Sequence, residues 1–141
     1  MERLVIPVNR KAAGVAIIYE DMVLLAKRAD LWEGQPFPFA GYWSIFGGAI
    51  ESGETPIECA VREAWEEARI KINPTKVNFL KILHNENCDF SVHSAIIESL
   101  EIPQLNEEHT EYGWFKINCL DSFTEKIDLN IIECIKSSQK N

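Results

Sequence analysis

The stretch that decides the fold is Gly47–Ile70, which reads GGAIESGETPIECAVREAWEEARI. Two glycines lead into a helix start, because Thr55 is a good N-cap and Pro56 suits the first helical turn. Glu58 follows the cap by three residues and completes a capping box. Apolar side chains then recur at helical spacing and predict one buried stripe, made of Ile57, Val61, Ala64, Trp65 and Ala68.

The same helix carries three glutamates, Glu63, Glu66 and Glu67, which we expect on the side opposite the apolar stripe. Like charges this close repel one another and raise each other's proton affinity unless a positive charge lies among them. A hard divalent cation is the natural partner, because Mg²⁺ prefers oxygen ligands and keeps waters for phosphate chemistry. A glutamate-rich helix face is more often only solvent-exposed surface. The residues upstream of the helix are therefore needed to distinguish a metal site from such a surface.

The whole stretch resembles the Nudix box, the signature G-x5-E-x7-R-E-U-x-E-E-x-G-U in which U is apolar. Its fixed positions are matched by Gly48, Glu54, Arg62, Glu63, Glu66 and Glu67, with Ala64 and Ile70 at the apolar positions. Chance rarely gives agreement at so many fixed positions. One position differs, because Arg69 stands where the family has the glycine that ends the helix. We therefore expect an effect on the helix end and none on the ligands.

Length and composition indicate a globular protein with a single domain over residues 1–141, since 46% of the residues are hydrophobic. The apolar runs are too short to span a membrane, and the N-terminus lacks the features of a signal peptide. Four cysteines without metal-site spacing fit free thiols in a reducing cytoplasm. A net charge of −8 argues against long nucleic acid as a partner.

Hydrophobic patterns along the chain predict a layered α/β domain. The expected elements are a strand at 4–8, a β-hairpin at 12–28, strands at 77–83, 90–96 and 112–117, a short helical turn from Asp121 or Ser122, and a closing helix marked by Ile127, Ile131, Ile132 and Ile135. The resemblance sharpens this to the Nudix-type α/β/α sandwich with a mixed, curved sheet.

The resemblance also implies a chemistry. Nudix enzymes cleave a diphosphate bond in a nucleoside diphosphate derivative: water attacks one phosphorus while metal ions neutralise the charge on the oxygens. By this resemblance Glu63 and Glu67 would be the principal Mg²⁺ ligands, and the carbonyl of Gly47 an additional one. Glu66 would bind a further metal or act as the base.

Other residues would support this cluster. Arg62, together with Glu54, would orient the carboxylates. Family members often supply one more acidic ligand from the loop before the last core strand, and Glu108 is the favoured candidate. Glu107 and Glu111 compete with it. A solvated loop glutamate is an equally good interpretation of each.

Substrate binding is assigned to one basic and two aromatic residues. Arg28, at the end of the hairpin, is the candidate for a substrate phosphate, although an exposed structural arginine is an equal interpretation. Trp32 and Phe37 lie in an aromatic loop on which a base can stack, whereas Trp43 is expected in the core. His109 could act as a base or contact a base edge, but a lone loop histidine more often has no catalytic role.

The leading functional prediction is a pyrophosphohydrolase that uses Mg²⁺, with Mn²⁺ as a substitute, on a small nucleotide such as a (d)NTP or a nucleotide sugar. Nothing in the sequence marks an interface, although the resemblance makes a homodimer possible because relatives often form one. The alternative is a catalytically inactive nucleotide-sensing module on the same fold, although such modules usually lose the box carboxylates. A prenyl-diphosphate isomerase would need cysteine and glutamate motifs that the sequence does not show.

Overall fold

The computed structural model of the protein describes residues 10–32, 34–36 and 39–139. Its elements are β1 (Arg10–Tyr19), β2 (Met22–Arg28), β3 (Leu31–Trp32), β4 (Gln35–Pro36), β5 (Trp43–Ser44), β6 (Phe46–Ala49), α1 (Pro56–Ala68), the 3₁₀ turn η1 (Pro74–Lys76), β7 (Val77–His84), β8 (Cys88–Ile96), β9 (His109–Lys116), the 3₁₀ turn η2 (Ile117–Ser122) and α2 (Leu129–Ser138). The strand expected at 4–8 lies outside the described residues.

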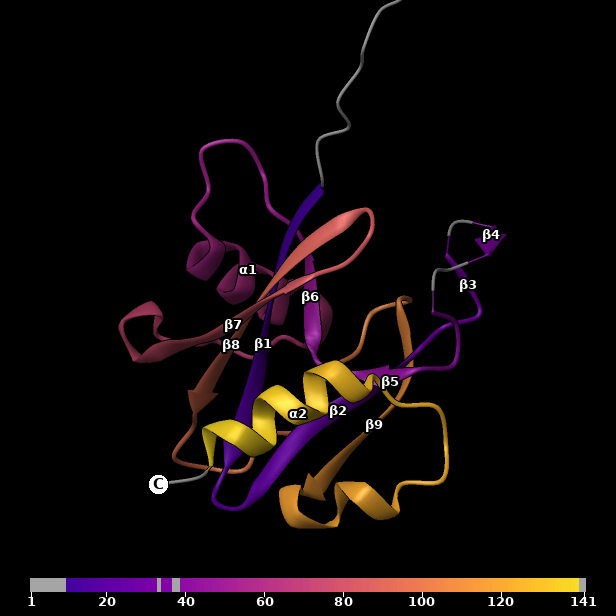
Figure 1. Ribbon diagram of the computed structural model, residues 1–141, viewed down its shortest axis with the longest axis vertical. Coiled ribbons are helices and arrows are strands. Elements are labelled where there is room, and N and C mark those ends of the chain that lie inside the picture. The colour runs from indigo at the N-terminus through magenta and orange to yellow at the C-terminus, as the bar shows by residue number, and fades with distance from the viewer. Residues whose placement is uncertain (1–9, 33, 37–38, 140–141) are drawn as a thin grey trace, which may run out of the picture.

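The predicted hairpin forms, but its strands separate soon after the turn. β1 and β2 pair only at Ile18↔Val23 and Tyr19↔Met22. Beyond that point β6 takes the place of β2 and pairs antiparallel with the first half of β1 (Figure 1). This split carries the glycine pair of β6, Gly47–Gly48, into the middle of the sheet.

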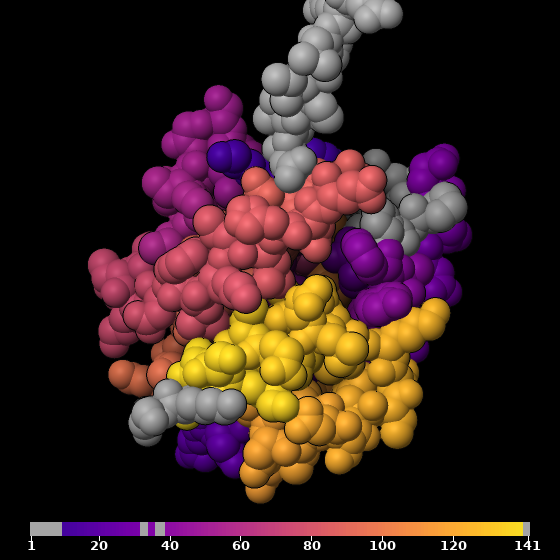
Figure 2. All heavy atoms as spheres, in the orientation of Figure 1, coloured from indigo at the N-terminus to yellow at the C-terminus, as the bar shows by residue number. Residues whose placement is uncertain are grey.

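The main sheet is mixed, as predicted. Its order is β5-β2-β1-β8-β7, with β6 also paired to β1 and β9 to β2. β1 and β8 run parallel over Arg10–Ile18, while the neighbouring pairs are antiparallel. Figure 1 looks onto the sheet from the α2 side, with α1 behind it, and Figure 2 shows α2 lying between the β7–β8 hairpin and the segment after β9. The α/β/α fold is therefore confirmed.

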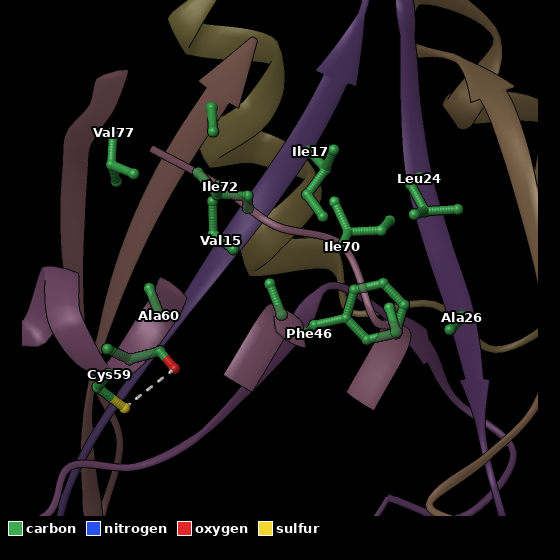
Figure 3. Close-up of a cluster of buried hydrophobic side chains, with 14 residues drawn as sticks. Val15, Ile17, Leu24, Ala26, Phe46, Cys59, Ala60, Ile70, Ile72 and Val77 are labelled. Atoms are coloured by element: carbon green, nitrogen blue, oxygen red, sulfur yellow. Dashed lines mark hydrogen bonds between the residues drawn. The ribbon is translucent and has the colours of Figure 1, made fainter. Parts of the chain in front are cut away.

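Two buried clusters fill the spaces on either side of the sheet, and the alternation along β1 separates them. Val15 and Ile17 face α1, whereas Ala16 and Ile18 face α2. Figure 3 shows the cluster on the α1 side, where Phe46 and Ile70 close the space beneath the helix. Neither α1 nor α2 combines the length and hydropathy needed to cross a membrane.

Helix α1 begins as predicted. The Thr55 hydroxyl accepts a hydrogen bond from the Glu58 N–H at 3.1 Å, and the Glu58 carboxylate accepts one from the Thr55 N–H at 2.9 Å. This reciprocal pair satisfies two backbone donors at the helix start.

The buried face of α1 differs from the prediction. Trp65 is 48% exposed, and the helix instead lies against the sheet through small side chains that allow a close approach: Cys59, Ala60, Ala64 and Ala68. Glu63 and Glu67 also lie on this buried side and not opposite it. The reason lies in strand β6, because its two glycines leave space next to α1, and the carboxylates of Glu63 and Glu67 occupy that space.

The C-terminal end of α1 falls where the family's glycine would place it, so the expected effect of Arg69 on the helix end is wrong. Arg69 adopts the left-handed conformation, with φ 57° and ψ 33°. An L-residue other than glycine in this conformation costs about 1 kcal/mol. Its guanidinium lies 5.1 Å from the centroid of the Trp65 ring, a contact that offsets part of this cost.

Other element boundaries also differ from those predicted, most of them by one to three residues. β9 begins at His109, three residues before the predicted strand. Asp121 and Ser122 end the turn η2 and do not start one, while Ile127 precedes α2. The predicted apolar positions of α2 are otherwise correct, because Ile131, Ile132 and Ile135 are buried.

The conformation of Arg69 gives a stability prediction. We expect Arg69→Gly to be more stable than Arg69→Ala by about 1 kcal/mol, because both lose the Trp65 contact and only glycine relieves the left-handed backbone. Urea unfolding of the two variants measures the difference. Glu133, which is exposed within α2, is the control position. There the alanine variant should be more stable than the glycine variant, since alanine is the better helix former. An Arg69→Ala protein as stable as Arg69→Gly would contradict the prediction.

Candidate functional site

The glycine pair of β6 allows two close approaches. A Cβ on Gly47 would lie 2.6 Å from the Ala13 carbonyl oxygen, and a Cβ on Gly48 would lie 2.5 Å from Oε1 of Glu63. The first contact is to the neighbouring strand and the second is to the helix. The missing side chains therefore let β1 and the Glu63 carboxylate contact β6 from two directions.

Arg62 is the centre of the predicted carboxylate cluster. Its Nε and Nη2 donate to the two carboxylate oxygens of Glu54 at 2.7 and 3.0 Å, a bidentate pair. Its Nη1 donates to Glu63 at 2.9 Å and to Glu66 at 3.1 Å. Nη2 also reaches the carbonyl of Ala49 at 3.1 Å, which anchors the guanidinium to β6.

Glu54 and Arg62 are both charged at neutral pH. The hydrogen bond from Arg62 lowers the pKa of Glu54 to about 2, and the backbone N–H of Glu51 adds a further donor at 3.0 Å. The same bond raises the pKa of Arg62 above its ordinary value. Glu54 and Arg62 therefore neutralise each other and leave little positive charge for the other carboxylates.

Glu67 is the most buried member of the cluster, at 1% exposure. Its Oε1 accepts the Gly47 N–H at 2.9 Å. Because a strand residue presents its N–H and C=O on the same side, the carbonyl of Gly47 faces the same region. Burial, with the charges of Glu108 and Glu63, raises the pKa of Glu67 well above its usual range, and burial likewise raises the pKa of Glu63. The cluster is thus short of positive charge.

The loop before β9 brings one more carboxylate to Glu67. Asn106 docks this loop on α1, because its N–H donates to the Glu67 carbonyl and its Nδ2 to the Glu66 carbonyl, both at 3.3 Å. Asn106 also holds Glu108, since its Oδ1 accepts the Glu108 N–H at 2.9 Å and its Nδ2 donates to Oε2 at 3.2 Å. Asn106 is not among the predicted site residues, although an asparagine two residues before Glu108 is typical of such a turn.

The three acidic candidates of this loop are placed differently. Glu108 is half-buried, and its charge acts on the buried Glu67. Glu107 is exposed, and Glu111 lies 3.5 Å from Lys27 on the neighbouring strand. The structure therefore brings Glu108 to the carboxylate cluster in preference to its two competitors.

Arg28 and His109 lie opposite each other where β2 meets β9. Arg28 is half-buried, and its charge interacts with Glu67 and Glu108. His109 is 5% exposed, its ring stands edge-on to Phe46 at 5.2 Å, and its Nδ1 lies 3.6 Å from Oε2 of Glu67. Burial, with the nearby Arg28, lowers the pKa of His109 to about 4, so the imidazole is neutral at pH 7.

The aromatic candidates have different outcomes. Trp43 is 4% exposed and stands edge-on to Phe115 and Phe123, so its predicted place in the core is confirmed. Phe37 lies outside the described residues. Trp32 belongs to β3 by its backbone, but its side chain is also outside what the structure describes.

The donors around Glu67 fit a hard divalent cation, since they are carboxylates and a backbone carbonyl. Within residues 10–32, 34–36 and 39–139, however, no three carboxylate, imidazole or thiol groups already converge as a metal site. Arg62 Nη1 holds Glu63 and Glu66, and the carboxyl groups of Glu63 and Glu67 interact with each other. The bidentate bond to Glu54 leaves Arg62 anchored if Nη1 releases the other two.

Comparison with known proteins gives one family. A family model described as the NUDIX domain matches residues 8–133. The chain is similar to the NAD-capped RNA hydrolase NudC of Chromobacterium violaceum, with 28% identity over 109 residues, and to the dihydroneopterin triphosphate diphosphatase of Haemophilus influenzae, with 27% identity over 100 residues. These matches cover 77% and 70% of this chain but 41% and 60% of the relatives, so the chain spans about half the length of the curated relatives it matches.

A solved structure supports the fold. The NUDIX domain of Shewanella oneidensis NrtR, crystallised with ADP ribose, superposes with a TM-score of 0.75 over 96% of this chain and 91% of that domain. The two sequences are 16% identical, so this likeness concerns the fold alone.

The lowered pKa of Glu54 predicts a pH dependence of stability. An unfolded glutamate has a pKa of about 4.3, so the stability from Glu54 is present above that value and is lost as pH falls through the folded value of about 2. We expect wild type to be more stable than Glu54→Gln at pH 6, and the difference to shrink towards pH 2. Urea unfolding across this range measures it.

The matched control is Glu86→Gln, an exposed residue between β7 and β8. We expect this substitution to change stability at pH 6 by less than Glu54→Gln does, because it leaves the Arg62–Glu54 pair intact. A pH-independent difference for Glu54→Gln would contradict the role given to the Arg62 pair.

Proposed function

The chain belongs to the NUDIX domain family, and we propose that it is a Mg²⁺-dependent pyrophosphohydrolase that cleaves a diphosphate bond in a small nucleotide derivative. The observation that carries this proposal is the carboxylate cluster, in which, among the described residues, five acidic side chains share the charges of only Arg62 and Arg28, and the pKa of the buried Glu67 is raised. A bound cation would supply that charge, neutralise the phosphate oxygens and make an attacking water easier to deprotonate.

Within this proposal Glu63, Glu67 and the carbonyl of Gly47 hold the cation, with Glu108 as a further ligand. This assignment is supported by the way the loop before β9 docks on the C-terminal end of α1, which brings Glu108 towards Glu67. Arg62 keeps the helix carboxylates in place. Mn²⁺ is expected to replace Mg²⁺, because both are hard cations that accept oxygen ligands.

Glu66 is assigned the role of the general base that accepts a proton from the attacking water. Its side chain is about half exposed and is held by Arg62 at 3.1 Å, so it borders the cluster and contacts solvent at the same time. In the proposed step the water oxygen forms a bond to one phosphorus, the bridging P–O bond breaks, and Glu66 takes a proton from the water. The products are two phosphate compounds.

Arg28 is proposed to bind a substrate phosphate. A half-buried guanidinium beside the carboxylates of Glu67 and Glu108 is placed to contact an anion that a cation has drawn to them. It would also offset the negative charge that the substrate brings. Stacking of a base on Trp32 and Phe37 stays a prediction.

For the substrate we propose a nucleoside triphosphate or a nucleotide sugar. The net charge of −8 disfavours a long RNA bound through its phosphates. The two curated relatives are a NAD-capped RNA hydrolase and a dihydroneopterin triphosphate diphosphatase, so NAD and dihydroneopterin triphosphate belong in the same test. The cytoplasmic location and the homodimer also stay predictions.

A hydrolysis screen with Mg²⁺ tests the proposal. We expect wild type to hydrolyse at least one of these compounds, EDTA to abolish the reaction, and Glu67→Gln to lower kcat/KM by about 100-fold or more. Asp121→Asn, in η2 away from the cluster, is the matched control and should keep the activity. If the protein bound nucleotides but hydrolysed none of the tested compounds, the result would favour the nucleotide-sensing alternative and contradict the proposal.

A further inference from the structure

His109 is a buried polar residue that the proposed reaction does not use. Its side chain is almost fully buried, as is that of Glu67, and the two come from β9 and α1, which are far apart in the sequence. Its Nδ1 is a buried nitrogen without a hydrogen-bond partner among the described residues. Since buried polar groups are nearly always paired, this nitrogen requires an explanation.

The Glu67 carboxylate offers the partner. Oε1 of Glu67 is fixed by the Gly47 N–H at 2.9 Å, while Oε2 lies 3.6 Å from Nδ1 of His109. That separation is slightly longer than a hydrogen bond. A small rotation of the carboxyl group would close it without movement of the backbone.

The imidazole is held in place and has little freedom to turn elsewhere. Its ring packs edge-on against Phe46 at 5.2 Å. Its backbone is fixed by the pairing of β9 with Arg28 on β2 and by the turn in which the His109 N–H donates to the Asn106 carbonyl at 3.3 Å. The ring is therefore a rigid support facing one oxygen of Glu67.

We propose that His109 is a positioning residue that donates its Nδ1–H to Oε2 of Glu67 and so fixes the plane of this carboxylate for a divalent cation. Gly47 then holds one oxygen and His109 the other, and each oxygen keeps a lone pair for the cation. The inference rests on the proposed function, because it is the bound cation that makes Glu67 an acceptor at both oxygens.

The geometry separates this role from that of a general base. His109 is 5% exposed and its Nδ1 faces a carboxyl oxygen, so the nitrogen has no room for an attacking water. Its effect on the reaction would pass through Glu67. Partners of metal ligands that act in this way typically contribute 10–100-fold to metal affinity.

A pair of substitutions tests the inference. His109→Leu removes the donor at similar volume, whereas His109→Asn keeps an N–H near the position of Nδ1. We expect His109→Leu to weaken Mn²⁺ binding, measured by the EPR signal of free Mn²⁺, by 10-fold or more, and His109→Asn to stay within about 3-fold of wild type. Thermal unfolding of both variants checks that they are folded.

Equal Mn²⁺ affinity in folded His109→Leu and wild type would overturn the inference, as would an equal loss in both variants. Absence of Mn²⁺ binding by wild type would overturn the proposed function and this inference with it.

A second measurement needs no variant. In the Mg²⁺-saturated wild type, long-range ¹H–¹⁵N NMR of the imidazole should show the neutral Nδ1–H tautomer of His109. The Nε2–H tautomer would overturn the inference even if His109→Leu fails to fold.

Discussion

The bidentate ion pair between Arg62 and Glu54 is the interaction on which the rest of the site depends. With Nε and Nη2 committed to Glu54, the guanidinium is anchored to the loop before α1 and, through Ala49, to β6. Its remaining nitrogen, Nη1, donates hydrogen bonds to two carboxylates of the same helix, those of Glu63 and Glu66. A planar donor with a fixed fork can do this, whereas a lysine at the same position would offer a single point charge.

The cost of this arrangement is electrostatic. One guanidinium lies among Glu54, Glu63 and Glu66, and Glu67 is buried beside them next to Glu108. Burying carboxylates without full counter-charge is unfavourable, and it raises the pKa of both Glu67 and Glu63. Such a cluster is poorly suited to stability alone and well suited to binding a cation, and this connects the fold to the proposed chemistry.

Local chemistry made part of this structure predictable from the sequence. The capping box of α1, the hairpin of β1 and β2 and the burial of Trp43 follow from residues close together in the chain. The carboxylates of the box could be named from their spacing, although their roles stay proposals. What the helical period could not predict is that Glu63 and Glu67 lie on the buried side, because the space for them comes from glycines on β6. The exposure of Trp65 has the same origin, and the contact of His109 with Glu67 depends on where β9 pairs.

The central claim is that the carboxylate cluster is one cation short, and titration calorimetry with Mg²⁺ at pH 7 tests it most directly. Because burial and its acidic neighbours raise the pKa of Glu67, we expect this group to carry a proton in the cation-free protein and to release it when a cation binds. We expect saturable Mg²⁺ binding, and a comparison of buffers with different ionisation enthalpies should show the release of about one proton. Glu67→Gln should abolish this proton release. Binding without proton release, or no binding by the wild type, would contradict the central claim.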